Sequence, residues 1–527
     1  MSNDRQASSG IAQLFRPHIA GEALDDLVTR QQYSRDASPY CQLPAAVLRP
    51  RDRDDVVAIV RIAGENGLAI IARAAGTSLA GQCVGAGVIL DMSAYFDAVL
   101  DVDKDARRAI VQPGVVRDAL NRHLAPFNLL FAPDPSTTDR CQIGGMIGNN
   151  AWGLHAVSRG TTRDHVTALE VVLADGTIAN FGLGRNDDTG KHGELIQNVN
   201  EIVRSRAADI EKAYPSVRGI TSNAGYALDV LLREQISDGM SGLVPLICGA
   251  EGTLAIVTRA TLKLIEPAAT TRLCCVHFDG IDAALRAVAG IRATQPAALE
   301  LMDRAILRLA ASHPQQSANR FWLRGDPAAV LLVEYAGASS QQVDNCVNEL
   351  QHIFDRNTMT IVTPEHVEHA WTLRRAALSM LMQAEGGLRA VTGIEDAAVA
   401  IADLPDFFAE VSELLRRQSL PFYVYGAVGM GSMHIRPELD LQAPGGLAQY
   451  ERLLDEVAAI TVRHRGSFTC KHGDGRMRGK YLGAVLGEGV LQAMRAVKRS
   501  FDPFGILNPG KILDCPPLTA DLIQQAR

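Results

Sequence analysis

The chain has 527 residues, too many for one ordinary hydrophobic core, so we expect two or three packed units. Its composition of 47% hydrophobic and 21% charged residues is that of a soluble globular protein. The net charge of −7, without any basic run, excludes a general attraction for nucleic acid or anionic membranes.

The first residues, MSNDRQASSG, lack the basic start and apolar stretch of a secretory signal, and no apolar run approaches the length of a membrane span. None of the nine cysteines forms a C-x-x-C pair, which excludes the usual iron–sulfur and structural zinc motifs. We therefore expect free thiols and a cytoplasmic protein.

Residues 1–41 are polar and predict a helical segment. From Val47, the pattern indicates strand, helix and strand, with Gly67 at the helix exit. Short strands follow in VGAGVILDMS, RRAIVQPG and TALEVVLADGT, and the last ends in a hairpin signal, Asp175-Gly176. The strand GTLAIVTRATLKLI stops before Pro267. This succession predicts an α+β domain over residues 42–268.

Residues 269–515 have a different sequence pattern, in which predicted strands such as AAVLLVEYAG alternate with amphipathic helices. We predict a second domain there, with an antiparallel sheet and helices on one face of it. Its last part, from about 445, is helical and ends in FDPFGILNPGKI. Residues 516–527 form a tail.

Three glycine-rich segments are candidates for ligand binding. RAAGTSLAGQ begins at Arg73, directly after a strand, and its small residues let backbone N–H groups converge on an anion. PDPSTTDRCQIGGMIGNNAWG begins at Pro133, and GAEGTLAIVT at Gly249. A tight turn, a packing loop and a turn into a strand are the alternative interpretations. The first two segments lack the Rossmann spacing, which disfavours a nicotinamide cofactor.

Together, these segments, with DHVTALEVVLADGT and FDPFGILNPGKI, resemble the vanillyl-alcohol-oxidase or PCMH type of flavoprotein. The resemblance covers about residues 30–515 and is greatest to the branch of FAD-linked 2-hydroxy-acid dehydrogenases. It implies a two-subdomain FAD-binding domain and a C-terminal cap domain whose antiparallel sheet is covered by helices. It also implies FAD contacts from Arg73, Ala74, Ala75, Gly76, Thr77, Ser78, Pro133, Asp134, Ser136, Thr137, Gly144, Gly145, Gly148, Asn149, Gly153, Glu251, Gly252, Ile256 and Asn508.

The first segment contains no histidine, the residue through which some relatives attach the flavin, so we expect non-covalent FAD. Cys141 could attack a flavin, but a packing role is the simpler interpretation. Since no iron–sulfur motif is present, we expect a separate iron–sulfur or quinone-linked protein to accept the electrons.

Removal of the substrate's hydroxyl proton requires a base, and His472 matches the base of the family's G-E-H-G segment. The alternative is a histidine packed on a glycine turn. Arg374 matches the arginine that binds the substrate carboxylate, with a solvated helix charge as the alternative. Arg436 is a rival for that role, or else part of a strand-end salt bridge. The neighbouring Arg375 is expected to be solvated.

The chain departs from the family at its metal site. Relatives bind a divalent ion through G-H-x-G-D-G-N-x-H and the glutamate of G-E-H-G. Here His434 remains, but the other two positions are Ala427 and Lys471, so we predict no metal. Lys471 either replaces the metal's charge or points to solvent. The lysine that relatives use for a distal carboxylate has no counterpart at 393–397, where Glu395 and Asp396 are expected to repel a second carboxylate.

These residues predict an FAD-dependent dehydrogenase or oxidase that acts on a small 2-hydroxy acid or related alcohol, with His472, Lys471, His434 and Arg374 as catalytic residues. One alternative is an enzyme of the same fold that uses another substrate, such as a biosynthetic intermediate, without a metal. Another is a catalytically silent FAD-binding subunit of a larger complex. The sequence does not determine the oligomeric state.

Overall fold

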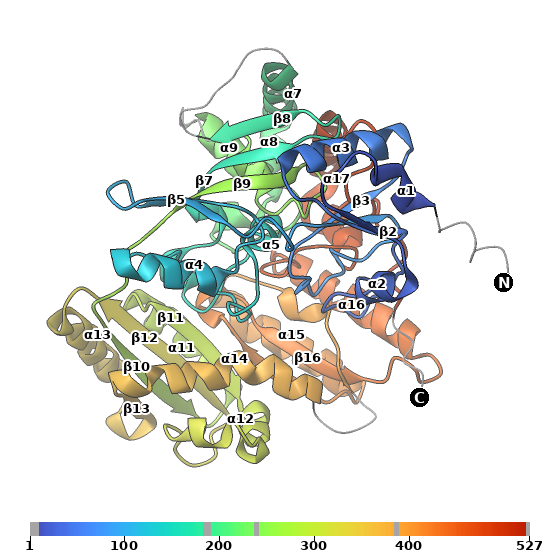
Figure 1. The fold of residues 1–527 in the computed structure, drawn as a ribbon. Coiled ribbons are helices and arrows are strands. Elements are labelled where there is room, and N and C mark those ends of the chain that lie inside the picture. The colour runs from blue at the N-terminus through green and yellow to red at the C-terminus, as the bar shows by residue number, and fades with distance from the viewer. Residues whose placement is uncertain (1–9, 183–190, 237–241, 384–388, 523–527) are drawn as a thin grey trace.

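The computed structural model describes residues 10–182, 191–236, 242–383 and 389–522. Three sheets organise them, with four, five and seven strands. The two smaller sheets lie in the blue-to-green half of Figure 1, and the seven-stranded sheet lies below them. This arrangement of helices with separate sheets is the predicted α+β class.

The four-stranded sheet has the order β1 (Glu22–Leu24), β2 (Ala46–Arg49), β4 (Val88–Asp91), β3 (Ile70–Arg73). β2, β3 and β4 are parallel, because α3 (Arg53–Glu65) makes the crossover, and β1 pairs antiparallel with β2. The prediction of a helical segment over 1–41 is therefore incomplete: two short helices, α1 (Ile11–Phe15) and α2 (Leu27–Gln32), flank a strand that extends the sheet.

The five-stranded sheet is antiparallel, in the order β5 (Val99–Asp103), β6 (Arg108–Val111), β9 (Ile256–Lys263), β7 (Val166–Val172), β8 (Ile178–Gly182). Gly176, with φ +77°, makes the predicted turn between β7 and β8. The same half of the chain contains seven further helices among the described residues: α4 (Arg117–Leu124), α5 (Ile143–Asn149), α6 (Ala156–Arg159), α7 (Lys191–Ser205), α8 (Ala207–Ala213), α9 (Leu228–Ile236) and α10 (Val244–Ile247).

The seven-stranded sheet is antiparallel, in the order β13 (Met359–Val362), β10 (Thr270–Phe278), β12 (Ala329–Gly337), β11 (Ala298–Asp303), β15 (Phe422–Gly426), β16 (His434–Leu439), β14 (Arg389–Ala390). Both of its faces are apolar. Cys274 and Val276 pack toward α11 (Ile281–Ala293), α13 (Ser340–Ile353) and α15 (Leu404–Arg417). Leu273 and Cys275 pack toward α12 (Arg304–Ser312) and α14 (Val367–Gln383).

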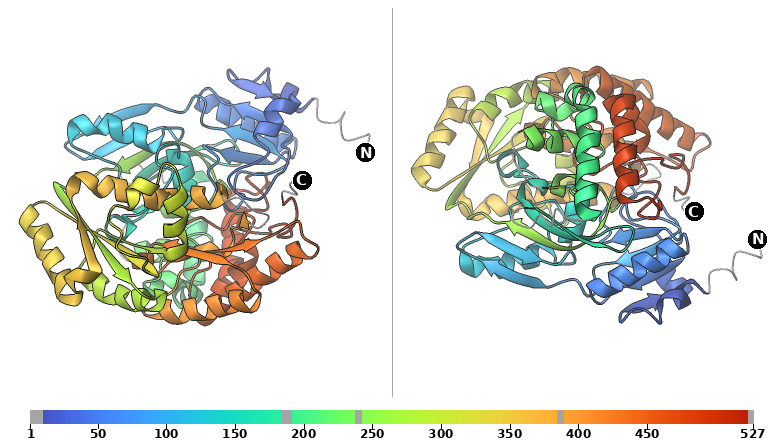
Figure 2. Two further views of the ribbon diagram at one scale, coloured as in Figure 1. Left: turned by 90° about the horizontal axis from the view of Figure 1, so that it is seen from below. Right: turned by 90° about the horizontal axis from the view of Figure 1, so that it is seen from above.

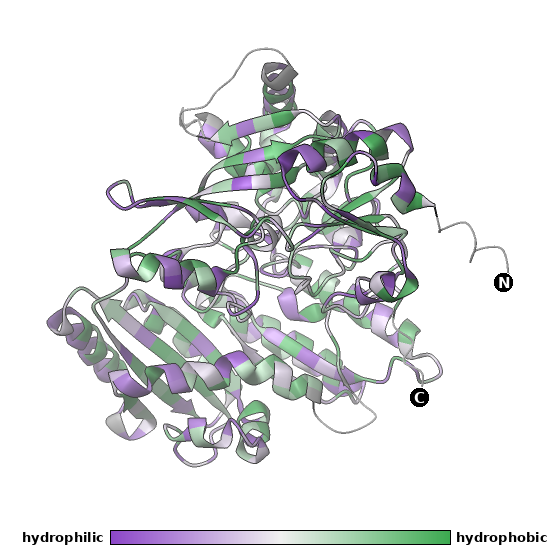
Figure 3. Ribbon diagram, viewed as in Figure 1, coloured by the Kyte–Doolittle hydropathy of each residue, from purple (hydrophilic) through white to green (hydrophobic). Residues whose placement is uncertain are grey.

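The prediction that helices cover only one face of this sheet is therefore wrong. The strands are apolar at successive positions, so both faces of the sheet are buried. Figure 3 shows this hydrophobic colouring along the strands, with hydrophilic residues on the outward sides of the helices.

The last helices, α16 (Gly446–Arg463) and α17 (Leu482–Phe501), lead the chain back to the first domain. α17 packs on α7 and α8, and Leu507 forms a parallel bridge with Ile70 of β3. Both views in Figure 2 place the last, red segments beside the blue and green ones. The predicted domain boundaries at 41, 268 and 515 remain predictions.

No helix among the described residues is both long and apolar enough to cross a bilayer. All nine cysteines are free, as predicted.

Candidate functional site

The glycine-rich segments meet around one elongated cavity between the three sheets. Its main chamber has a volume of about 520 Å³, and a smaller chamber of about 80 Å³ adjoins it. Arg73, Ala74 and Gly145 line both chambers, so the two are adjacent. A space of this size fits a large organic ligand or cofactor.

Backbone conformation explains two of the glycines of this cavity, Gly76 and Gly252. Gly76 has φ +66°, which L residues with a side chain rarely adopt. A Cβ added at Gly145 would lie 3.5 Å from the Cβ of Ala74, and one at Gly252 would lie 3.4 Å from that of Ala72. Both distances are ordinary van der Waals contacts, so a Cβ would fit at Gly145, whereas φ +71° disfavours a side chain at Gly252.

Most of the predicted FAD contacts line this cavity: Arg73, Ala74, Ala75, Gly76, Thr77, Ser78, Ser136, Thr137, Gly144, Gly145, Gly148, Asn149, Glu251, Gly252 and Ile256. Pro133, Asp134, Gly153 and Asn508 are not among its lining residues. Asn508 instead connects two of the segments, since its side-chain amide donates to the carbonyls of Gln82 (3.0 Å) and Glu251 (2.7 Å).

The donor set fits FAD. Thr77, Ser78 and backbone groups of a strand-following glycine loop face the space, as a pyrophosphate requires. Two thiols, Cys83 and Cys141, also line it, and burial raises the pKa of each to about 11. Both therefore stay protonated near neutral pH and are poor nucleophiles, which supports the prediction of non-covalent FAD.

Glu251 fastens the third segment to the loop that carries His472. Its carboxylate accepts from the Gly475 N–H at 2.9 Å and from the Gln82 amide at 3.2 Å. Burial, followed by the nearby Asp474, raises the pKa of Glu251 to about 8. Gln82 also donates to the His472 carbonyl at 2.7 Å. The cofactor segments and the predicted base are thus held by the same contacts.

His472 lines the main chamber and is oriented by Glu395. Its Nδ1 lies 3.1 Å from a carboxylate oxygen of Glu395, which in turn lies 2.8 Å from Arg478. Burial would raise the pKa of Glu395, but Arg478, Arg436 and His472 outweigh it and hold that pKa well below its ordinary value. An ionised carboxylate only accepts, so Nδ1 carries a hydrogen, and in the neutral tautomer of the ring Nε2 is the acceptor.

His434 lies parallel to His472, with ring centroids 5.2 Å apart. Its Nδ1 donates to the Glu395 carbonyl at 2.7 Å. Burial, then the neighbouring His472 and Lys471, hold the pKa of His434 well below its ordinary value, so the ring is neutral. It lines the chamber as a second imidazole with an unprotonated Nε2.

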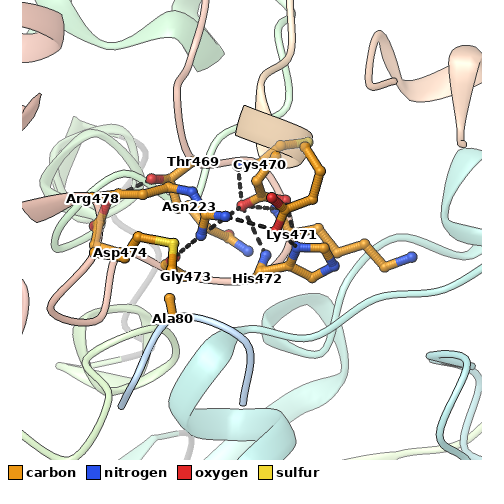
Figure 4. A network of polar contacts seen from close by, with 12 residues as sticks. Ala80, Asn223, Thr469, Cys470, Lys471, His472, Gly473, Asp474 and Arg478 are labelled. Atoms are coloured by element: carbon orange, nitrogen blue, oxygen red, sulfur yellow. Dashed lines mark hydrogen bonds and ion pairs between the residues drawn. The ribbon is translucent and has the colours of Figure 1, made fainter. Parts of the chain in front are cut away.

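The expected repulsion by Glu395 and Asp396 is wrong, because neither lines the cavity. Both are fully buried under the His472 loop. Asp396 accepts from the backbone N–H groups of Cys470, Lys471 and His472 at 2.9 to 3.1 Å. Figure 4 shows the segment from Thr469 to Asp474 joined to Arg478 in one network of polar contacts. Glu395 and Asp396 therefore hold the conformation of the loop that carries His472.

Three buried cationic side chains line the main chamber near Tyr425, His434 and His472: Arg374, Arg436 and Lys471. Arg374 is ion-paired with the buried Glu300, to which its Nε donates at 2.8 Å, and its guanidinium lies over the Tyr425 ring. Arg436 donates from Nε to the Tyr425 hydroxyl at 2.8 Å, while its buried Nη1 has no hydrogen-bond partner.

Lys471 is buried rather than solvated, with 9% exposure. Its ammonium lies 4.6 Å from the centre of the Trp152 ring, a cation–π distance. Trp152 is fixed beneath it, since its indole N–H donates to the Cys470 carbonyl at 3.0 Å. Burial lowers the pKa of Lys471. The rim residue Arg375 contacts Glu368, in keeping with a more solvated position.

Asp134 belongs to a network that the sequence analysis missed. His155 lies between two carboxylates, with Nδ1 2.5 Å from Asp134 and Nε2 2.9 Å from Glu334. The Trp371 indole donates to the other oxygen of Glu334 at 2.5 Å. This network joins the loop before Ser136 to β12 and α14, the helix of Arg374. A signal was present: Glu334 and Glu300 interrupt apolar strands, and a buried acid needs a partner.

The donor set does not fit the divalent metal that the resemblance implies. Ala427 packs among Trp152, Ile220 and Cys470, and the third position carries the Lys471 ammonium. Within the described ranges, no three His, Cys, Asp or Glu side chains cluster as a metal site. His434 alone cannot hold the ion.

The chain matches two known families and several known proteins. Residues 44–182 match the FAD binding domain family, and residues 267–512 match the C-terminal domain of FAD linked oxidases. D-2-hydroxyglutarate dehydrogenase of Pantoea ananatis (strain AJ13355) is 32% identical over 95% of this chain and 51% of that protein, so the chain spans about half of that relative's length. Glycolate oxidase subunit GlcD of Bacillus subtilis (strain 168) is 30% identical over 93% of both chains.

The fold is also that of p-cresol methylhydroxylase with substrate bound, at a TM-score of 0.69 and 15% identity over 95% of this chain and 96% of that one. The predicted PCMH-type fold and the FAD cofactor are thereby confirmed. The chain belongs to the FAD-linked oxidase family.

Proposed function

We propose that this protein uses FAD to oxidise a small 2-hydroxy acid to the 2-oxo acid. The observation that carries the proposal is His472, an imidazole whose Nδ1 is held by Glu395 and which lines the same chamber as the cofactor segments. The names of the relatives, a D-2-hydroxyglutarate dehydrogenase and a glycolate oxidase subunit, support the substrate class.

Bound FAD supplies the hydride acceptor. The substrate's hydroxyl proton passes to Nε2 of His472, the hydrogen on C2 leaves with its electron pair, and the C–O bond becomes a carbonyl. The resulting imidazolium is stabilised by Glu395, as in a carboxylate–histidine pair. His434 lies beside His472 as a neutral imidazole, so it adds no charge that opposes the proton transfer. Arg374 lies over the Tyr425 ring and orients that side chain toward the substrate.

We further propose that the electrons leave to a separate iron–sulfur or quinone-linked protein in the cytoplasm. The sequence has no nicotinamide fingerprint, and the free cysteines suit a reducing compartment. The chain should not reduce NAD at a steady rate. Such reduction by the isolated protein would disprove this route.

Anaerobic titration of the bound flavin tests the proposal. The protein is mixed with D- and L-2-hydroxy acids, simple alcohols and amines, and the flavin absorbance is followed. We expect one class of 2-hydroxy acid to bleach it. Bleaching only by an alcohol or amine would favour another substrate on the same fold, to which the altered Ala427 and Lys471 positions also point. Bleaching by dithionite alone would indicate a non-catalytic subunit.

A further inference from the structure

Beside His434 and His472, the main chamber holds two buried cations, Arg436 and Lys471, that no described carboxylate contacts directly. Among the described residues, no Asp or Glu oxygen lies within ion-pair distance of Arg436 or Lys471, whereas Arg374 pairs with Glu300 and Arg478 with Glu395. Exposure is 1% for Arg436 and 9% for Lys471. A buried charge without a partner is costly, so this arrangement favours an anionic ligand that supplies one.

Their supports hold the two cations in place. The Tyr425 hydroxyl fixes Nε of Arg436 at 2.8 Å, which leaves the outer guanidinium nitrogens for other acceptors, and Nη1 has none within the protein. Lys471 lies over Trp152, and Asp396 fixes its backbone N–H at 3.0 Å. Both side chains line the same chamber as His472.

We propose that Arg436 and Lys471 form a metal-free clamp for the carboxylate and hydroxyl oxygens of the substrate. In this clamp, Arg436 takes the carboxylate-binding role expected of Arg374, whose charge Glu300 already balances. Lys471 takes the role of the divalent ion, for which the ligands are missing. Arg436 offers the planar donors that suit a carboxylate. Lys471, a point charge on a flexible stem, stabilises the oxygen that loses its proton to His472.

The inference rests on the proposed function, but binding can test it without turnover. The probe is 2-hydroxyisobutyrate, which carries a carboxylate and a hydroxyl but no hydrogen on C2 to transfer. The control ligand is the amide of the same acid, which keeps its hydroxyl and shape but lacks the negative charge. Binding to the FAD-loaded protein is followed by the shift of the flavin spectrum, before and after chelator treatment, with elemental analysis for zinc, manganese and iron.

We expect the wild-type protein to bind the anion more tightly than the amide, with no stoichiometric metal and no effect of the chelator. Lys471→Met and Arg436→Met should each weaken anion binding at least about tenfold, the loss of one charge-assisted contact, with little change for the amide and with FAD content retained. Lys104→Met, on the exposed turn between β5 and β6, is the control and should bind like wild type.

The clamp is disproved if the wild-type protein does not prefer the anion, if both variants bind it normally, or if the chelator abolishes binding and added metal restores it. Anion binding that both variants lose, together with no bleaching by any 2-hydroxy acid, would instead support the clamp and overturn the proposed function.

Discussion

His155 should make the stability of the protein depend on pH in the alkaline range. Both of its ring nitrogens face carboxylates, at 2.5 Å from Asp134 and 2.9 Å from Glu334. Since a carboxylate only accepts, both nitrogens must donate, and the ring is an imidazolium. Burial alone would lower the pKa of His155, but Asp134 and Glu334 outweigh it and raise the pKa to about 9.

The size of the effect follows from this pKa. Between its ordinary value of 6.5 and about 9, each pH unit corresponds to about 1.36 kcal/mol, which gives about 3 kcal/mol in the free energy of unfolding. Because the pKa is raised on folding, this stabilisation is complete below about pH 6.5 and is lost as the pH rises through about 9. With about 2.1 cal/mol/K of unfolding entropy per residue, it amounts to roughly 3 °C in Tm for this chain.

The assay compares the Tm of wild type and His155→Gln from pH 6 to 10 at saturating FAD. The two should differ by roughly 3 °C or more near pH 6.5 and converge toward pH 10. The double variant Asp134→Asn, Glu334→Gln is the control, because it keeps the imidazole and removes its partners, and it should lose the same pH dependence. A Tm difference that stays constant across this range would show that His155 only packs.

Three further predictions concern the cofactor and the base. His472→Ala should lower turnover roughly a hundredfold to ten-thousandfold with FAD content unchanged, and a loss below about tenfold in stopped-flow assays would remove His472 as the base. Gly76→Val should lose FAD before it loses its fold, because φ at Gly76 is +66° and its backbone faces the cavity; normal flavin content after purification would contradict this. Acid precipitation should release free FAD, and colour retained in the pellet would point to covalent attachment through Cys83 or Cys141.

Local signals in the sequence predicted which loop would line the cavity. A loop of small residues after a strand, as at Arg73 to Ser78, needs only its own backbone to face a ligand, and these residues line the cavity. Glycine turns such as Gly176 were also predicted, because φ is a local property.

Side-chain partners were harder to predict, because they come from distant strands. Asp134 was assigned to FAD, yet its side chain faces His155, and the pairing of Arg374 with Glu300 spans two elements of the cap domain. Neither spacing nor periodicity gives such contacts. From the sequence, Lys471 could either replace the charge of the metal or point to solvent. Tertiary packing decides between the two, because it brings Lys471 over Trp152.

In the proposed function, a hydroxyl proton goes to His472 while the C2 hydrogen is transferred to FAD. The most direct test is rapid anaerobic mixing of the protein with the 2-hydroxy acid that bleaches its flavin, in protiated and C2-deuterated form. We expect one 2-oxo acid per FAD reduced, slower bleaching with the deuterated acid, and almost none of this reaction in His472→Ala. Dithionite-reducible flavin that no 2-hydroxy acid bleaches would contradict it.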